Sequence, residues 1–209
     1  KVSVSQIQKG LVDSALMDIE MSAQLTRPRF VEGVKDLTPA QKGSIMHFVM
    51  QHLDFNQVQN QKAIRQQVEM MVNQDLLLED EAGTINTNKI YRFFNSSLGQ
   101  RILKAREVER EVPFNQLRYV GEIMDDSTAP DEQMLVQGVI DIFFHEGDDI
   151  VLVDFKTDYV TEENRKELIS FYQLQLKLYK EALQTILGKK VKESYLYFFG
   201  IDEAVPVEI

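Results

Sequence analysis

The sequence predicts a mixed α/β domain: a central mixed sheet flanked by helices, with a helical region in front of the first main strand. Helical periodicity dominates the chain up to about residue 105, and the apolar residues take the period of strands from about residue 108. A long helical stretch then precedes a final apolar strand. With 209 residues the chain can bury a full core, and it suits one mixed domain better than two.

Residues 1–36 are expected to form an arm ahead of the domain, which would span residues 37–209. The arm holds one amphipathic segment near Gln6–Met21, followed by the breaker sequence Arg27–Arg29. The first residue is Lys1 and not Met, so we expect the chain to be a piece of a longer protein or a processed product.

Four helices are predicted in the front half of the domain. Thr38 is expected to cap the first helix, with Pro39 at its first position and its end near Leu53. A glutamine-rich stretch at 57–74 carries an apolar stripe and predicts the second. The remaining two are expected at about 87–94 and 97–105.

The second half is predicted to be strands joined by short connections, with one long helix. That helix should run from Thr161 to about Leu187 and end at Gly188. A hairpin is expected at 138–158, with the polar turn His145–Asp149. The other expected strands cover residues 108–117, 118–124 and 193–199, with a loop at 125–131.

Charge and cysteine content restrict the class of protein. The formal net charge of −10 argues against a free-standing nucleic-acid binder, because such proteins need basic surface to replace phosphate counterions. An acidic domain can still act on DNA if another part of the protein delivers the strand. Since cysteine is absent, the chain holds no disulfide, thiolate-bound iron–sulfur cluster or cysteine-based zinc site, which agrees with a cytosolic protein. We find no membrane-length apolar run and no signal peptide at the start.

Two acids and a lysine stand inside the apolar strands of the predicted hairpin. Asp141 lies in the first strand and Asp154 in the second, and Lys156 leaves the same face of its strand as Asp154. Charges in buried strands are costly unless they are paired or bound to a metal. The three residues predict a site for a divalent cation and a phosphate. A buried Asp154–Lys156 ion pair without function explains the hairpin alone equally well.

Upstream, a histidine and two acids are weaker candidates. His47 lies on an apolar helix, where a lone histidine is more often a packed residue than a ligand, and His52 is expected on the helix surface. Glu109 and Glu111 alternate along one strand and share a face, which could simply be exposed. Glu111 leads directly into an apolar segment, where an inward-facing acid would be unusual.

The long helix adds a glutamine and a tyrosine. Gln175 and Tyr179 are four residues apart and therefore lie on one face of the helix. Tyr179 could be a packed tyrosine with a solvated hydroxyl. Gln175 is harder to explain by packing, because a half-buried amide needs a hydrogen-bond partner.

Five segments occur in an order that resembles a known family: GSIMH, an acid before VPF, GVIDIFF, VDFKTD and YQLQLKLY. Together they resemble the RecB-type nuclease domain of the PD-(D/E)XK superfamily. The surrounding segments SVSQIQK, RPRF and LTPAQKGSIMHFVMQHL are closer still to the C-terminal nuclease domain of the AddA (RexA) subunit of bacterial helicase–nucleases. The resemblance covers the chain from about Val2 to its end.

The resemblance implies a restriction-endonuclease-like core and a role for each site residue. The implied metal ligands are the side chains of His47, Asp141 and Asp154 and the main-chain carbonyl of Phe155. The implied catalytic residues are Asp141, Asp154, Lys156, Glu111, Gln175 and Tyr179. Glu109 could replace Glu111 by a two-residue slip. Phe155 stands where related sequences often have tyrosine.

The resemblance also implies the reaction and the partners. We expect Mg²⁺-dependent, exonuclease-type hydrolysis of single-stranded DNA in double-strand-break repair and recombination, with Mn²⁺ as a possible substitute. The DNA would be delivered by helicase domains upstream in the same polypeptide, together with an AddB (RexB)-like partner subunit, in the bacterial cytoplasm and without a membrane. One alternative is a catalytically inert docking or DNA-guiding module of the same fold, and another is a stand-alone nuclease of a related family.

Overall fold

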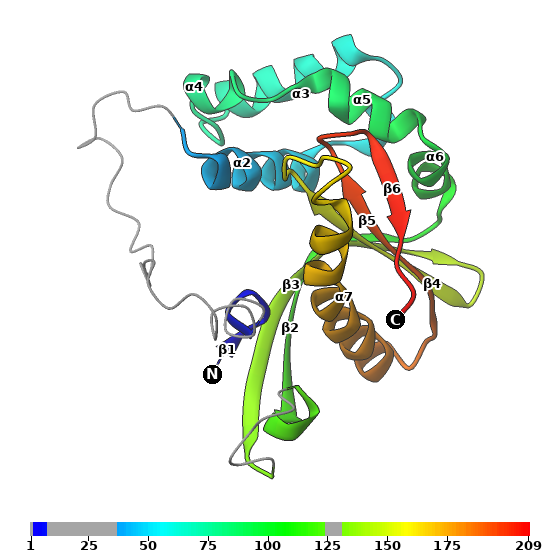
Figure 1. The fold of residues 1–209 in the computed structure, drawn as a ribbon. Helices are drawn as coiled ribbons and strands as arrows, with labels where there is room; N and C mark the ends of the chain where they lie inside the picture. Colours follow the sequence, from blue (N-terminus) through cyan, green and yellow to red (C-terminus); the bar gives the residue numbers. More distant parts are fainter. Residues whose placement is uncertain (1, 8–36, 124–130) are drawn as a thin grey trace.

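A computed structural model describes residues 2–7, 37–123 and 131–209 of the chain (Figure 1). Six strands form one mixed sheet, which confirms the predicted fold class. The strands are β1 (Val2–Ser3), β2 (Val108–Tyr119), β3 (Gln133–Glu146), β4 (Asp149–Lys156), β5 (Val191–Phe198) and β6 (Glu203–Pro206). Among the described residues, no helix is long and apolar enough to cross a membrane.

The sheet has the order β1-β3-β4-β5-β6, and β2 pairs with β3 along its other edge. The β2–β3, β3–β4 and β5–β6 pairs are antiparallel, whereas β4 and β5 are parallel. Parallel neighbours require a crossover, and helix α7 (Arg165–Leu187) provides it (Figure 1). The long helix is therefore held beside the end of β4.

The remaining helices precede β2 in the chain and lie together in Figure 1. They are α2 (Pro39–His52), α3 (Gln61–Asn73), α4 (Glu79–Ala82), α5 (Thr87–Asn95) and α6 (Ser97–Lys104), with a 3-10 turn at Phe55–Gln57 between α2 and α3. A second 3-10 turn, Val120–Glu122, follows β2. One buried core joins helices α2–α6 to the sheet, and a second joins α7 to it. In the first, Phe93 packs edge-on against Phe155 and Tyr197, with ring centroids 5.1 and 4.6 Å apart.

Several local predictions are confirmed. Thr38 caps α2, Pro39 follows at its first position, and the helix ends one residue before Leu53. Gly188 ends α7 with a left-handed φ of 63°. The β3–β4 hairpin turns between Glu146 and Asp149, and Gly147 there has a φ of 66°.

Other predictions were wrong. The two strands expected at 108–117 and 118–124 are one strand, β2, because β3 is long enough to pair with it from Val108 to Tyr119. Helix α7 begins at Arg165 and not at Thr161, since Thr161 and Asn164 exchange side-chain hydrogen bonds with each other's backbone ahead of the helix. Strand β6 was missed.

The predicted arm is described only in part. Its amphipathic segment, Gln6–Met21, lies almost entirely outside the described residues, as do the breaker at 27–29 and most of the loop at 125–131. Residues 2–7 are described: β1 pairs in parallel with β3, and Val4 and Ile7 are buried in the core next to α7.

Strands β2 and β3 both exchange their two side-chain faces at one point, which we call the turn-over point. On β3, Ile140 packs in the α7 core, while Ile142, two residues later, packs in the α2–α6 core. On β2, the Arg110 guanidinium reaches the main-chain carbonyls at the end of α2, while Val112 packs in the α7 core. Residues two apart on a regular strand share a face, so both strands change faces between these positions. Glu111, between Arg110 and Val112, has a left-handed φ of 51°.

Candidate active site

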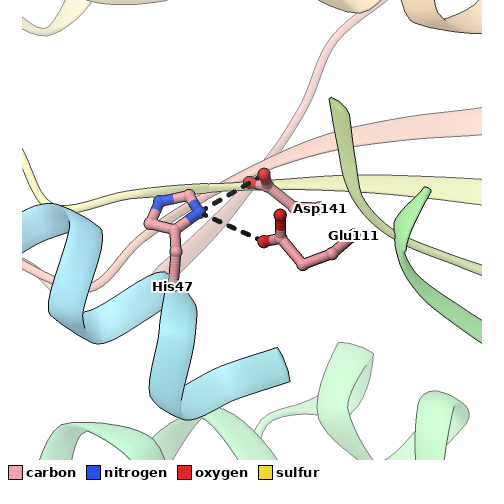
Figure 2. A group of neighbouring side chains, drawn as sticks. All are labelled: His47, Glu111 and Asp141. Carbon is pink, nitrogen blue, oxygen red and sulfur yellow. Dashed lines mark ion pairs between the residues drawn. The ribbon is translucent and has the colours of Figure 1, made fainter. Parts of the chain in front are cut away.

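The turn-over point brings two acids together with a histidine from α2 (Figure 2). Arg110 pairs with Ile142 and Val112 with Ile140, so the register places Glu111 opposite Asp141. His47 Nδ1 lies 3.3 Å from an oxygen of Asp141 and 3.9 Å from an oxygen of Glu111. Ligand atoms of all three residues lie within 4.8 Å of one another. This compact group is the centre of the candidate site.

Helix α2 holds His47 at the sheet through its packing and one glycine. Met46 and Val49 are buried on either side of the partly exposed His47. A Cβ atom at Gly43 would lie only 2.9 Å from the hydroxyl of Thr157, so glycine permits α2 to approach the chain just beyond β4. His47 is therefore fixed next to the end of the strand that carries Lys156.

Asp141 and Asp154 are both buried, and each carboxylate has a different partner. Asp141 Oδ2 accepts a hydrogen bond from the backbone N–H of Phe155 at 2.7 Å. Asp154, 1% exposed, forms a 2.5 Å ion pair with Lys156. Asp154 is consequently not part of the compact group formed by His47, Glu111 and Asp141.

A chain of polar contacts leads from Asp154 into helix α7. The Lys156 ammonium donates to Gln175 Oε1 at 2.9 Å, and Gln175 Nε2 donates to the hydroxyl of Tyr179 at 2.7 Å. Gln175 and Tyr179 are both buried. The amide thus has a partner at each end, which explains why glutamine occupies this position.

Burial and neighbouring charges shift the acid–base properties of the group. Burial lowers the pKa of His47, but the charge and hydrogen bond of Asp141 outweigh this and raise the pKa to about 8. Burial and the nearby charge of Asp141 raise the pKa of Glu111 to about 7. Burial opposes ionisation of Asp141, yet His47 holds the pKa of Asp141 below its usual value. Burial raises the pKa of Asp154 in spite of Lys156. The site therefore concentrates groups that titrate near neutral pH.

The structure brings together most of the residues predicted from sequence. Glu111, and not Glu109, lies beside His47, and Glu109 is exposed. His52 is exposed, as expected. Phe155 donates its N–H to Asp141, and its carbonyl stays a predicted metal ligand.

Sequence reasoning missed three residues beside the site. Thr157, Asp158 and Tyr172 line an open groove of about 600 Å³, which His47, Glu111 and Lys156 also line. Tyr172 precedes Gln175 by three residues and Tyr179 by seven, so the spacing along α7 could have revealed that it shares their face.

The donor set fits a hard divalent cation. Carboxylate oxygens suit Mg²⁺ and Mn²⁺, and an imidazole nitrogen is compatible with Mn²⁺. His47, Glu111 and Asp141 offer one nitrogen and two carboxylates, one buried and one partly buried. Carboxylates this close repel each other unless a positive charge lies between them.

Comparison with known proteins identifies the family. The chain matches a family model described as the PD-(D/E)XK nuclease superfamily over residues 20–206. It is 44% identical over 209 residues to an ATP-dependent helicase/nuclease subunit of the AddA type from Syntrophomonas wolfei, covering 98% of this chain and 16% of that protein. The corresponding subunits of Alkaliphilus oremlandii and Clostridium botulinum are 40% and 36% identical over 98% and 100% of this chain, which spans 17% of each.

The match includes every segment on which the resemblance rests except SVSQIQK, at residues 3–9. The chain spans less than a fifth of the length of these relatives. It belongs to the PD-(D/E)XK nuclease superfamily and is similar to one segment of AddA-type helicase/nuclease subunits.

Proposed function

We propose that the chain hydrolyses phosphodiester bonds of single-stranded DNA in a reaction that depends on Mg²⁺, with Mn²⁺ as a substitute. The observation that carries this proposal is the convergence of His47, Glu111 and Asp141 beside the Asp154–Lys156 pair. Buried acids that repel one another next to a lysine suit a cation and an anionic substrate better than they suit a packed core.

Each residue has a distinct proposed role. His47, Asp141, Asp154 and the Phe155 carbonyl would hold the cation, and Glu111 would supply a further acid. When bound, the cation would neutralise charge on the phosphate and favour ionisation of the attacking water. Lys156 would orient that water or stabilise the charge that develops on the phosphate oxygens.

Gln175 and Tyr179 would act on the lysine from behind. The Gln175 carbonyl oxygen accepts from the Lys156 ammonium, and Tyr179 fixes the other end of the amide. An amide held at both ends keeps its oxygen directed at the lysine. We infer that the pair holds the ammonium in its place between Asp154 and the groove.

The charge of the chain favours delivery of DNA by another part of the protein. A net charge of −10 repels a free polyanion, so capture of DNA from solution would be weak. The relatives carry the name helicase/nuclease, which suggests helicase domains in the same polypeptide as the source of the strand. We therefore propose that residues 37–209 form the nuclease domain and that residues 1–36, of which residues 2–7 pair with or pack against its sheet, connect it to the helicase. An AddB-like subunit would complete the cytoplasmic complex for repair of double-strand breaks.

Cleavage of a labelled single-stranded oligonucleotide tests the proposal directly. The wild-type chain should cleave it in Mg²⁺ and not in EDTA, and Asp154→Asn and Lys156→Met should each abolish cleavage while circular dichroism stays unchanged. Asp75→Asn and Lys62→Met are matched controls at exposed positions of α3 and its end, and they should cleave normally. Full cleavage by Asp154→Asn would refute the mechanism.

The inert-module alternative makes a different prediction. A guiding module without a working site should show no cleavage by the wild-type chain in either metal. Calorimetry with Mn²⁺ then distinguishes the two functions further. An inert module should show no Mn²⁺ binding that is lost when Asp141 is replaced.

A further inference from the structure

Lys156 has a third neighbour that the proposed roles leave out. The ring of Tyr172 lies with its centroid 4.0 Å from the Lys156 ammonium, within the range of a cation–π contact. Tyr172 comes from α7, like Gln175, and it lines the groove beside Lys156. The ammonium is thus enclosed by the Asp154 carboxylate, the Gln175 amide and an aromatic ring.

The other end of Tyr172 is held by a carboxylate. Its hydroxyl lies 3.0 and 3.1 Å from the two oxygens of Asp158 and donates to that carboxylate. Burial and the charge of Asp158 raise the pKa of Tyr172, so the hydroxyl keeps its proton at neutral pH. Tyr172 therefore contacts the lysine with its ring and Asp158 with its hydroxyl.

This arrangement separates Lys156 from a competing acid. Asp158 follows Lys156 by two residues, just as Asp154 precedes it by two. Both acids are close enough in the chain to attract the same ammonium, yet the ion pair in the described structure joins Lys156 to Asp154, while Asp158 is engaged by Tyr172. A lysine drawn to Asp158 would leave Asp154 and the group around His47.

We propose that Tyr172 is a positioning residue for Lys156: its ring holds the ammonium against Asp154 and Gln175, and its hydroxyl keeps Asp158 from competing for it. This inference rests on the proposed nuclease function. Tyr172 also packs against the α7 core, but packing alone accounts neither for the contact of its ring with the lysine ammonium nor for the hydrogen bond of its hydroxyl to an acid.

The test compares four variants of the full chain: Tyr172→Leu, Tyr172→Phe, Asp158→Asn and the double variant Tyr172→Phe with Asp158→Asn. Tyr172→Leu should lower kcat for single-stranded DNA cleavage about ten- to thirtyfold, with KM and Mn²⁺ affinity unchanged. Tyr172→Phe keeps the ring but releases Asp158, so it should lose less. Adding Asp158→Asn to Tyr172→Phe removes the competing charge and should restore at least half of the lost activity.

The readouts separate positioning from general support of the fold. Tyr119→Leu, a change of an equally large but more exposed tyrosine at the far end of β2, is the control and should leave kcat unchanged. Thermal melts and Mn²⁺ calorimetry accompany each variant. Wild-type kcat in Tyr172→Leu would overturn the inference, as would a Tyr172→Phe defect that Asp158→Asn fails to relieve. If the wild-type chain itself does not cleave DNA, the proposed function fails first, and the two failures are thereby distinguished.

Discussion

Replacing Asp141 with asparagine should return the pKa of His47 in the metal-free protein from about 8 to its ordinary value of 6.5 or below. Asp141 lies 3.3 Å from the imidazole and is the principal group that raises this pKa, while burial works in the opposite direction. The difference between 8 and 6.5 corresponds to about 2 kcal/mol of interaction with the protonated ring, at about 1.36 kcal/mol for each pKa unit. The asparagine keeps the shape of the side chain and removes its charge.

The same contact should make stability depend on pH. Because folding raises the pKa of His47, its contribution to the free energy of unfolding is fully present below pH 6.5 and is lost as pH rises through about 8. Between these pH values the free energy of unfolding of the wild-type chain should fall by up to about 2 kcal/mol. The free energy of unfolding of Asp141→Asn should not show this fall. Below pH 6.5, where His47 is protonated in both the folded and the unfolded wild-type chain, His47 should add no pH dependence to the difference in free energy of unfolding between the two proteins.

NMR titration of the imidazole resonances in EDTA measures the pKa, and urea unfolding at several pH values measures stability. Asp148→Asn, an exposed change in the turn of the same hairpin, is the control and should leave the His47 titration unchanged. A His47 pKa near 8 in Asp141→Asn would refute the assignment of the shift to Asp141. A wild-type pKa near 6.5 would refute the close pairing itself.

Three further predictions concern the stability of the fold. Arg101→Met should lower the free energy of unfolding by about 1–2 kcal/mol in urea melts, because Glu146 and Glu193 lose their shared partner. Arg92→Met, at a 60% exposed side chain, should lower it by under about 0.5 kcal/mol, and equal losses in the two variants would contradict this. Phe93→Ala should lower the free energy of unfolding by about 3–5 kcal/mol, since the fully buried ring contacts four other aromatic rings. A loss under about 1 kcal/mol would show that the core can collapse around the cavity. Gly99→Ala should lower the melting temperature markedly, because its Cβ would lie 2.1 Å from a backbone oxygen, whereas Gly83→Ala, with 3.4 Å available, should change it little.

The sequence was informative wherever one local pattern determined one local structure. Thr38 and Pro39 identified the start of α2 because capping depends on residues next to each other in the chain. Gly188 identified the end of α7 for the same reason. The acids in the hairpin were visible because a charge inside an apolar strand is unusual whatever the tertiary structure.

Features that depend on the partner strand could not be predicted. The continuity of β2 depends on the length of β3, and Leu117 and Tyr119 are exposed, so their apolar character gave no sign of which face is buried. Glu109 remained an alternative to Glu111 because the two share a strand face in the sequence pattern, and the contact of Glu111 with His47 on α2 distinguishes them. Tyr172 was overlooked because a helical stripe of apolar and aromatic residues usually indicates a core, and only the position of Lys156 gives this ring a different role.

The turn-over of β2 and β3 makes the site sensitive to changes in chain length. Deleting Pro113, just beyond this point, would move Phe114 and every later side chain of β2 to the opposite face, so that Phe114 would leave the α7 core. Deleting Glu111 itself would remove the acid that lies opposite Asp141, while Arg110 and Val112, then adjacent, would keep their present faces on a regular strand. Toward Tyr119, past the part of β3 that also pairs with β1, the two strands can lengthen or shorten in step without altering this register. Among relatives, an alignment gap within residues 108–114 should therefore indicate a lost or altered site more reliably than a substitution there.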